Sequence, residues 1–231
     1  MPIHRVSPAF DEVRARVHGA STGHELVIVL NHESLAGVVE PRGQNERVVS
    51  CARRGRGYAL ACGVAESRGD IVLLLHGDTL LPAGWDGAIL GALSDRRVVG
   101  GGFRLAFDRP SVFLDFTARI TDFFDLVGGA MWGDRALFGR AGAVKKCLPE
   151  LDVPFFEDVR LSKALRQMGK LTLLDEKVIT GTEHFRRYGP FKHCLRILKA
   201  RAWYATGVDP QKIYDYYYSR GSKAQGARRE G

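Results

Sequence analysis

The chain has 231 residues, of which 45% are hydrophobic and 26% are charged, which is enough to bury one sizeable α/β core. Its formal net charge of +8 favours anionic partners such as nucleotides, sugar phosphates, nucleic acid or acidic lipid headgroups. No apolar run approaches the length of a membrane span, so we expect any membrane contact to be peripheral.

The four cysteines are scattered, without the spacing of a metal site or of a disulfide framework. Reduced thiols in a cytoplasmic protein are the simplest interpretation, and nothing at the amino terminus resembles a signal peptide. Residues 219–231 are basic and rich in small residues, which predicts a disordered tail. We therefore expect a single domain over residues 1–218.

Buried-strand patterns alternate with helix patterns in the first third of the chain. Short apolar runs predict strands, and apolar residues at helical spacing predict helices. The expected strands span residues 3–6, 25–30, 47–51 and 71–75, the expected helices span 11–18 and 58–67, and a further helix opens at Pro82. This strand–helix–strand rhythm predicts an α/β fold with a parallel, doubly wound sheet.

The rest of the chain mixes strands with longer helices. Strands are expected over residues 98–107, 136–138, 171–174 and 177–179, and helices over 110–127, 159–168 and 191–206. The packed face of helix 110–127 is predicted to carry Phe113, Phe116, Ile120 and Phe124.

Helix 191–206 is basic and amphipathic. Lys192, Arg196 and Lys199 oppose an apolar face of Phe191, Leu195, Leu198 and Ala202. We expect that apolar face to pack on the core. The alternative is that the helix lies on an anionic membrane.

The most informative segment is a buried apolar strand that stops at His76-Gly77-Asp78-Thr79. In open α/β sheets ligands bind at the carboxyl ends of strands, and carboxylate oxygens suit Mg²⁺ or Mn²⁺. Asp78 is therefore a candidate ligand of a divalent cation beside a phosphorylated substrate. The alternative is that Asp78 and Thr79 only cap the following turn.

Three further patches carry candidate functional groups. Glu157 and Asp158 follow two phenylalanines at an expected helix start, where they either cap the helix or include a desolvated carboxyl suited to general-base work. Residues 132–135, Trp-Gly-Asp-Arg, form either a platform for a sugar face or a buried tryptophan beside a surface ion pair. Residues 182–187, Thr-Glu-His-Phe-Arg-Arg, either bind diphosphate oxygens or are simply solvated.

In chain order the motifs are a strand with His-x-Asp-Thr, Gly-Gly-Phe-Arg-Leu, Trp-Gly-Asp-Arg-Ala-Leu-Phe, Glu-Asp-Val-Arg-Leu-Ser and His-Phe-Arg-Arg. Together they resemble family 2 glycosyltransferases of the GT-A fold, and within them a small bacterial group assigned to arsenosugar biosynthesis. The resemblance covers residues 25–218. It implies a Rossmann-like fold with a mostly parallel central sheet flanked by helices, a nucleotide-sugar-binding half at 1–80 and an acceptor and catalytic half at 81–218.

The resemblance also implies roles for individual residues. Asp158 matches the catalytic base of the Glu-Asp motif, with Glu157 in support. Asp78 matches the last carboxylate of the metal motif and His76 stands where its first carboxylate often lies, so the implied cofactor is Mg²⁺ or Mn²⁺. The residues expected to bind the donor are Pro8, Asn31, Arg56, His76, Asp78, Arg186 and Arg187. The residues expected to bind the other substrate are Trp132, Gly133, Asp134 and His184.

The implied activity is inverting transfer of a sugar from a nucleotide-diphosphate sugar, with UDP as the expected nucleotide. The acceptor is a small molecule or is lipid-linked, and no nucleic acid partner is expected. Two departures from the family pattern fall on nucleobase recognition: residues 8–12, Pro-Ala-Phe-Asp-Glu, stand for Pro-x-x-Asn-Glu-Glu, and residues 31–34 replace an aspartate and glycines.

These departures motivate an alternative, a degenerate and non-catalytic binding protein whose nucleotide site has eroded. Arg135 replaces a usual glutamine of the family pattern, a change that bears on the identity of the acceptor. A glycoside hydrolase is a third hypothesis. It would need two carboxylates that face each other across the scissile bond, whereas Glu157 and Asp158 are adjacent in the chain.

Overall fold

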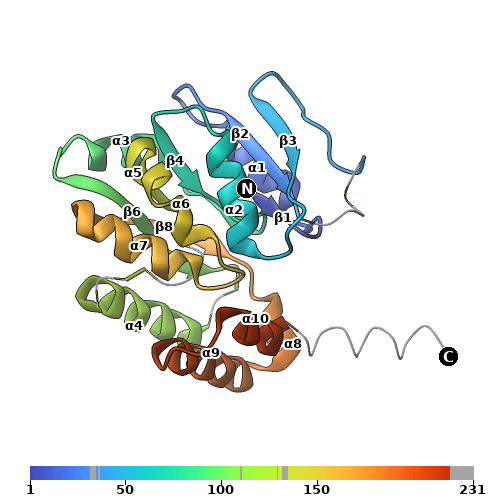
Figure 1. Ribbon diagram of the computed structural model, residues 1–231, viewed down its shortest axis with the longest axis vertical. Coiled ribbons are helices and arrows are strands. Elements are labelled where there is room, and N and C mark those ends of the chain that lie inside the picture. Colours follow the sequence, from blue (N-terminus) through green and yellow to red (C-terminus); the bar gives the residue numbers. More distant parts are fainter. Residues whose placement is uncertain (32–34, 36, 110, 129, 132–134, 219–231) are drawn as a thin grey trace.

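The computed structural model describes residues 1–31, 35, 37–109, 111–128, 130–131 and 135–218. For residues 126–128, 184 and 187 it describes the backbone alone. The expectation of a basic tail at 219–231 lies outside the described residues. Figure 1 shows helices on both sides of a central set of strands, with α4 and α9 at the end of the molecule opposite β2 and β3.

The first half of the chain builds a three-stranded parallel sheet in the order β1-β2-β3. Its elements are β1 (Pro2–Ile3), α1 (Phe10–His18), β2 (Leu26–Leu30), β3 (Glu46–Ser50) and α2 (Arg56–Glu66). All five residues of β2 are buried because helices cover both of its faces. Side chains alternate along a strand, so Leu26, Ile28 and Leu30 pack with residues of α1, whereas Val27 and Val29 pack with Ala59 of α2.

The remaining strands form a five-stranded mixed sheet in the order β4-β7-β6-β8-β5. They are β4 (Ile71–Leu74), β5 (Thr79–Leu80), β6 (Val98–Phe107), β7 (Leu137–Arg140) and β8 (Lys170–Thr180). The helices that follow α2 are α3 (Trp85–Leu93), α4 (Val112–Gly128), α5 (Ala141–Lys146), α6 (Leu148–Leu151), α7 (Glu157–Met168), α8 (Glu183–Tyr188), α9 (Pro190–Ala205) and α10 (Pro210–Tyr218). The expected α/β class is confirmed.

Two expectations about individual elements were wrong. Residues 171–174 and 177–179 belong to one strand, β8, because its parallel pairing with β6 continues past the polar residues at 175–177 through a register shift at Phe103/Arg104. The helix expected to open at Pro82 begins at Trp85, after Gly84 in a left-handed conformation with φ of 69°. Among the described residues, no helix is long and apolar enough to cross a membrane.

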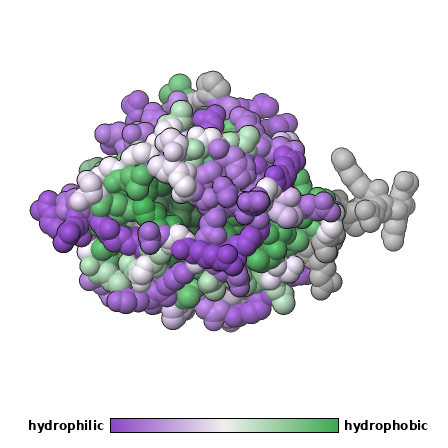
Figure 2. Space-filling view, turned by 90° about the horizontal axis from the view of Figure 1, so that it is seen from above, coloured by the Kyte–Doolittle hydropathy of each residue, from purple (hydrophilic) through white to green (hydrophobic). Residues whose placement is uncertain are grey.

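The predicted packed face of α4 was wrong. Phe116 and Phe124 are 62% and 60% exposed, whereas Asp122 and Asp125 on the other side of the helix are buried. The apolar face of α9 was also expected on the core, yet Phe191 and Leu195 are 74% and 67% exposed. Seen from above in Figure 2, by contrast, hydrophilic residues cover most of the surface, and hydrophobic ones show mainly in recesses.

A buried arginine explains the orientation of α4. Arg135, which is fully buried, donates from Nη1 to Asp122 Oδ1 at 2.6 Å and to the carbonyl oxygen of Phe103 at 3.2 Å. Its Nε lies 2.5 Å from Asp125 Oδ2. Buried charges are stable only when they are paired, so α4 must turn its two aspartates inward, and its phenylalanines are left outside.

Replacing Arg135 by methionine should destabilise the fold strongly. Arg135→Met keeps the length of the side chain but removes the buried cation that Asp122 and Asp125 share, and Asp122 keeps only the longer contact of 3.6 Å with Arg104. Breaking a buried ion pair by removing one partner costs about 3–5 kcal/mol. The free energy of unfolding, measured by urea titration, should fall by that amount.

The matched control is Arg97→Met. Arg97 pairs with Asp95 on the surface, where it is 82% exposed, so the same substitution should leave the unfolding midpoint unchanged within error. An equal effect of the two substitutions would contradict the structural role assigned to Arg135.

Candidate functional site

The carboxyl ends of the first strands meet at one edge of the molecule. Ile3 of β1 pairs with Leu30 of β2, so both strands end side by side. The turn after β4 reaches the same place: the Oγ of Ser7 donates to the carbonyl oxygen of Gly77 at 2.7 Å, and a Cβ on Gly77 would lie 2.9 Å from Ile3 Cγ2. We call this region the strand-end edge.

Three predicted donor-binding residues come from segments at this edge. Pro8 is exposed in the turn before α1, directly after Ser7. His76 is half-buried and Asp78 is exposed, and both flank Gly77 between β4 and β5. Both residues follow β4, which alternates half-buried and buried residues where a fully buried strand was expected, and their role in binding stays a prediction.

Helix α8 approaches the same edge from the carboxyl-terminal part of the chain. β5 pairs with the end of β8, Thr79 opposite Thr180, so the chain leaves β8 beside the Asp78 turn. Glu183 is the first residue of α8, and its Oε2 lies 2.9 Å from Nη2 of Arg5, in the segment after β1, so the two form an ion pair. Arg186 of this helix is exposed, whereas the side chains of His184 and Arg187 lie outside the described residues.

Asn31 fastens the end of β2 to the loop before α2. Its Nδ2 donates to the carbonyl oxygen of Arg53 at 2.6 Å, and its Oδ1 accepts from the backbone N–H of Gly55 at 3.0 Å. Gly55 has φ of 143°, a value that favours glycine, and Arg56 follows it as the first residue of α2. Asn31 thus sets the position of Arg56.

Arg56 joins the first half of the chain to the two carboxylates of the Glu-Asp motif. Its Nε forms an ion pair with Glu157 Oε1, and its Nη2 lies 3.5 Å from Asp158 Oδ2. Glu157 and Asp158 are the first two residues of α7, as expected for carboxylates at a helix amino terminus. Gly57 of α2 packs directly on the segment before α7, since a Cβ on Gly57 would lie 2.1 Å from the carbonyl oxygen of Val153.

The two carboxylates differ in their surroundings. Glu157 is fully buried, and among the described residues its Oε2 has no hydrogen-bond partner. Burial raises the pKa of Glu157 to about 7; Arg56 opposes this rise and Asp158 adds to it. Asp158 is 7% exposed, and its Oδ1 accepts from the N–H of Val159 at 2.8 Å. The sequence left open whether these carboxylates only cap the helix or include a desolvated carboxyl. The desolvated carboxyl is that of Glu157.

Two residues of α9 that the sequence did not single out also lie near Asp158. Tyr204 packs on Phe156 with 4.8 Å between ring centroids, and desolvation raises its pKa, with a further rise from the charge of Asp158. Desolvation lowers the pKa of Arg201, while the charges of Asp125 and Asp158 act in the opposite direction. No local motif marks either residue, because only the tertiary packing of α9 brings them to α7.

The predicted residues thus fall into two groups joined by Asn31 and the loop it holds. Pro8, His76 and Asp78 lie at the strand-end edge with the backbone of α8, and Arg56 lies with Glu157 and Asp158. The predicted residues Trp132, Gly133 and Asp134 lie outside the described residues. Their neighbour Arg135 is buried in the core of the molecule, not on its surface.

Asp78 and His76 could hold a divalent cation only if the substrate supplies further ligand atoms. Asp78 supplies carboxylate oxygens and His76 an imidazole, a pair that suits Mn²⁺ and in part Mg²⁺. The described residues contain no group of three or more His, Cys, Asp or Glu side chains that could hold a metal ion. Mg²⁺ commonly uses one or two carboxylates together with phosphate oxygens, so these residues fit a cation shared with a diphosphate.

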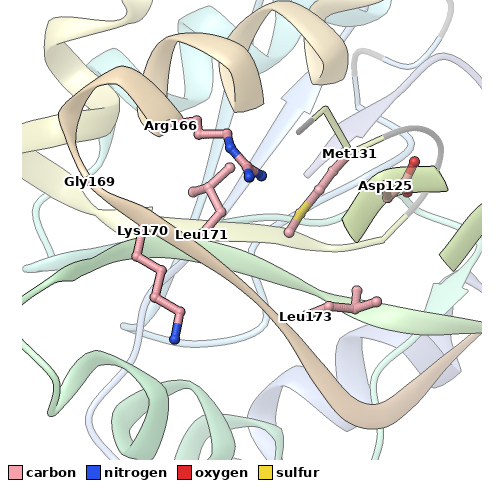
Figure 3. A pocket seen from close by; sticks show the side chains of 7 residues that line it. All are labelled: Asp125, Met131, Arg166, Gly169, Lys170, Leu171 and Leu173. Atoms are coloured by element: carbon pink, nitrogen blue, oxygen red, sulfur yellow. The ribbon is translucent and has the colours of Figure 1, made fainter. Parts of the chain in front are cut away.

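A cavity of about 300 Å³ is lined by none of the predicted site residues that the structure describes. Its lining comes from Met131, from α4, from the carboxyl end of α7 and from the start of β8, including Asp125, Arg166 and Lys170 (Figure 3). It shares no residue with the two groups described above. We therefore place the candidate site at the strand-end edge and at the group formed by Arg56, Glu157 and Asp158.

Comparisons with known proteins show the fold. No protein-family model matches the chain, and no curated protein matches it in sequence. Among solved structures, S. aureus TarS 1–349 matches with a TM-score of 0.58 and 12% identity, over 78% of this chain and 59% of that one. The same fragment in complex with UDP-GlcNAc gives 0.58 and 13% identity, over 78% and 56%.

The fragment in complex with UDP matches with a TM-score of 0.54 and 13% identity, over 78% of this chain and 58% of that one. This chain thus spans less than two thirds of the TarS chains that it matches. TarS is a GT-A-type glycosyltransferase, and the likeness extends over most of the chain described above. The chain therefore has a GT-A-type fold.

Proposed function

We propose that the protein is an inverting glycosyltransferase that moves a sugar from a nucleotide-diphosphate sugar to an acceptor hydroxyl. One observation carries the proposal: Arg56 ties the loop held by Asn31, at the strand-end edge, to Asp158 at the start of α7. The GT-A-type fold and the complexes of TarS with UDP-GlcNAc and UDP support a nucleotide-sugar donor. The arsenosugar subgroup rests on the sequence motifs alone.

In this proposal the donor diphosphate lies at the strand-end edge. Asp78 and His76 would hold a divalent cation, which when bound neutralises charge on the diphosphate. Arg186 and Arg187 on α8 add positive charge for the leaving phosphates, and Pro8 and Asn31 shape the nucleotide side of the edge. UDP is the nucleotide we expect, by analogy with the TarS complexes.

Asp158 is the proposed general base. As its carboxylate takes the proton of the acceptor hydroxyl, the acceptor oxygen bonds to the anomeric carbon and the bond from that carbon to the diphosphate oxygen breaks. Glu157 is too deeply buried to meet a substrate, so we assign it the task of holding Arg56 beside Asp158. Trp132, Gly133, Asp134 and His184 are the proposed contacts of the acceptor, a small molecule or a lipid-linked one.

Asp158→Asn should nearly abolish transfer and leave donor binding intact. Loss of a general base lowers the rate by about 10²–10⁴-fold, while the amide keeps the size of the side chain. UDP release would be measured with acceptors found by screening, and donor affinity by calorimetry.

The control for this substitution is Asp175→Asn. The side chain of Asp175 is 91% exposed on β8, so this variant should retain wild-type turnover. Near-wild-type turnover of Asp158→Asn would show that another group takes the proton.

Asp78→Asn should weaken the dependence of UDP binding on Mn²⁺. One carboxylate oxygen is replaced by a poorer amide donor, so the gain in affinity on adding Mn²⁺ should shrink by about tenfold or more, as for other losses around a metal site. Calorimetric titration of UDP with Mn²⁺ and with chelator measures this gain directly. The control is Asp70→Asn, an exposed aspartate before the opposite end of β4, which should bind UDP like the wild type.

The same titrations test the alternative of a degenerate binding protein. That alternative is motivated by Asn31, whose side chain bonds to the loop backbone where the family pattern has an aspartate. If a folded protein binds no member of a panel of nucleotide sugars with Mn²⁺, the donor site is eroded and the glycosyltransferase proposal fails. Binding without any transfer would place the chain among non-catalytic binding proteins.

Glu157→Gln should change the pH dependence of stability. A raised pKa means that the folded state holds the proton more tightly than the unfolded state, so the stabilisation from Glu157 is present below about pH 4.5 and is lost towards about pH 7. Glutamine has no proton to lose, so its urea midpoint should change less between pH 5 and pH 8.

Glu150→Gln serves as the control, because Glu150 is partly exposed and paired with Arg160. It should keep the wild-type pH profile of the urea midpoint. Identical profiles for Glu157→Gln and the wild type would show that Glu157 is ionised in the fold at all these pH values.

A further inference from the structure

Two neighbouring helices expose most of the large apolar side chains that remain outside the core. Of fourteen such exposed residues among the described ones, nine lie on α4 and α9, six on the first and three on the second. We call this surface the α4–α9 face; its members are Val112, Phe113, Phe116, Ile120, Phe123, Phe124, Phe191, Leu195 and Leu198. Soluble monomers rarely expose a contiguous apolar patch this rich in phenylalanine without an interaction partner.

The apolar stripes of the two helices form one continuous surface. The rings of Phe113 on α4 and Phe191 on α9 stack with centroids 5.6 Å apart and 27° between their planes. In Figure 1 the two helices run next to each other along one end of the molecule. The buried sides of both are already occupied, α4 by the Arg135 ion pairs and α9 by His193 and Ala200, so the outward orientation of the apolar stripes is fixed by the fold.

The exposed charges bordering this face are mainly positive. Arg119, Lys192 and Lys199 are exposed on the two helices, against a single exposed acid, Asp115. The Nζ of Lys199 lies 4.7 Å from the ring centroid of Trp203 and 4.9 Å from that of Tyr216, so this cation lies where α9 meets α10. An apolar surface that carries exposed cations is complementary to a bilayer that contains anionic lipid.

We infer that the α4–α9 face docks on an anionic membrane surface, with its phenylalanines and leucines among the acyl chains and its cations at the headgroups. A second copy of the chain suits the face less well, because an isologous contact would place patch against identical patch and bring the cations together. The inference does not depend on the proposed function. It does place the candidate site near the bilayer, since α9 also packs through Tyr204 on Phe156, the residue before Glu157.

Sedimentation with vesicles tests the inference. The full chain should sediment with vesicles of phosphatidylcholine and phosphatidylglycerol, less with phosphatidylcholine alone, and less as salt rises from about 25 mM to about 150 mM, because salt screens the cations. Phe116→Glu/Phe191→Glu should weaken binding to anionic vesicles by more than about tenfold. Arg119→Glu/Lys192→Glu should remove the preference for anionic over neutral vesicles.

The matched control is Leu90→Glu, a leucine that is 46% exposed on α3, away from the face; it should bind vesicles like the wild type. Circular dichroism would confirm that every variant is folded. Absence of sedimentation with both vesicle types at low salt overturns the inference. So does a dimer in solution, seen by light scattering, that Phe116→Glu/Phe191→Glu converts to monomer, because the face would then be an interface between copies.

Discussion

The ion pairs of Arg56 with Glu157 and Asp158 are the contact on which the arrangement of the candidate site depends. They join the first residue of α2 to the first turn of α7, two elements separated by about a hundred residues of chain. Two effects oppose each other at this contact. Burial disfavours the charged form of Glu157, whereas the neighbouring cation Arg56 favours it. Apolar side chains of similar volume could fill the same space at little cost in stability, so the charges at this point are better explained by the proposed chemistry of the site than by stability.

Much of the fold could be predicted from local patterns. The continuous apolar run in β2 identified a strand covered on both faces, and the strand before His76 and Asp78 pointed to the edge where the candidate donor site lies. The start of α7 at the two carboxylates followed from the preference of helix amino termini for negative charge. These features succeeded because each depends on neighbours in the sequence.

The predictions that were wrong or missing have a common cause: they depend on contacts between residues far apart in the sequence. Hydrophobic spacing in α4 correctly indicated a helix but gave the wrong face, because Arg135 requires two buried aspartates and no local signal shows that partnership. Likewise, Arg201 and Tyr204 come near Asp158 only through the packing of α9, and the polar residues of β8 stay in a strand only because β6 pairs with them. Periodicity measures amphipathicity, but it does not say which face meets water when charges must also be buried.

Gly57 determines how closely α2 packs against the segment before α7. With backbone against backbone at this point, α2 and the segment before α7 have no side chain between them that could rotate to absorb a displacement. Gly57 therefore fixes how closely α2 approaches the segment before α7, and with it how closely Arg56 approaches Glu157 and Asp158. Any side chain at position 57 would push α2 away from that segment and separate Arg56 from the first turn of α7.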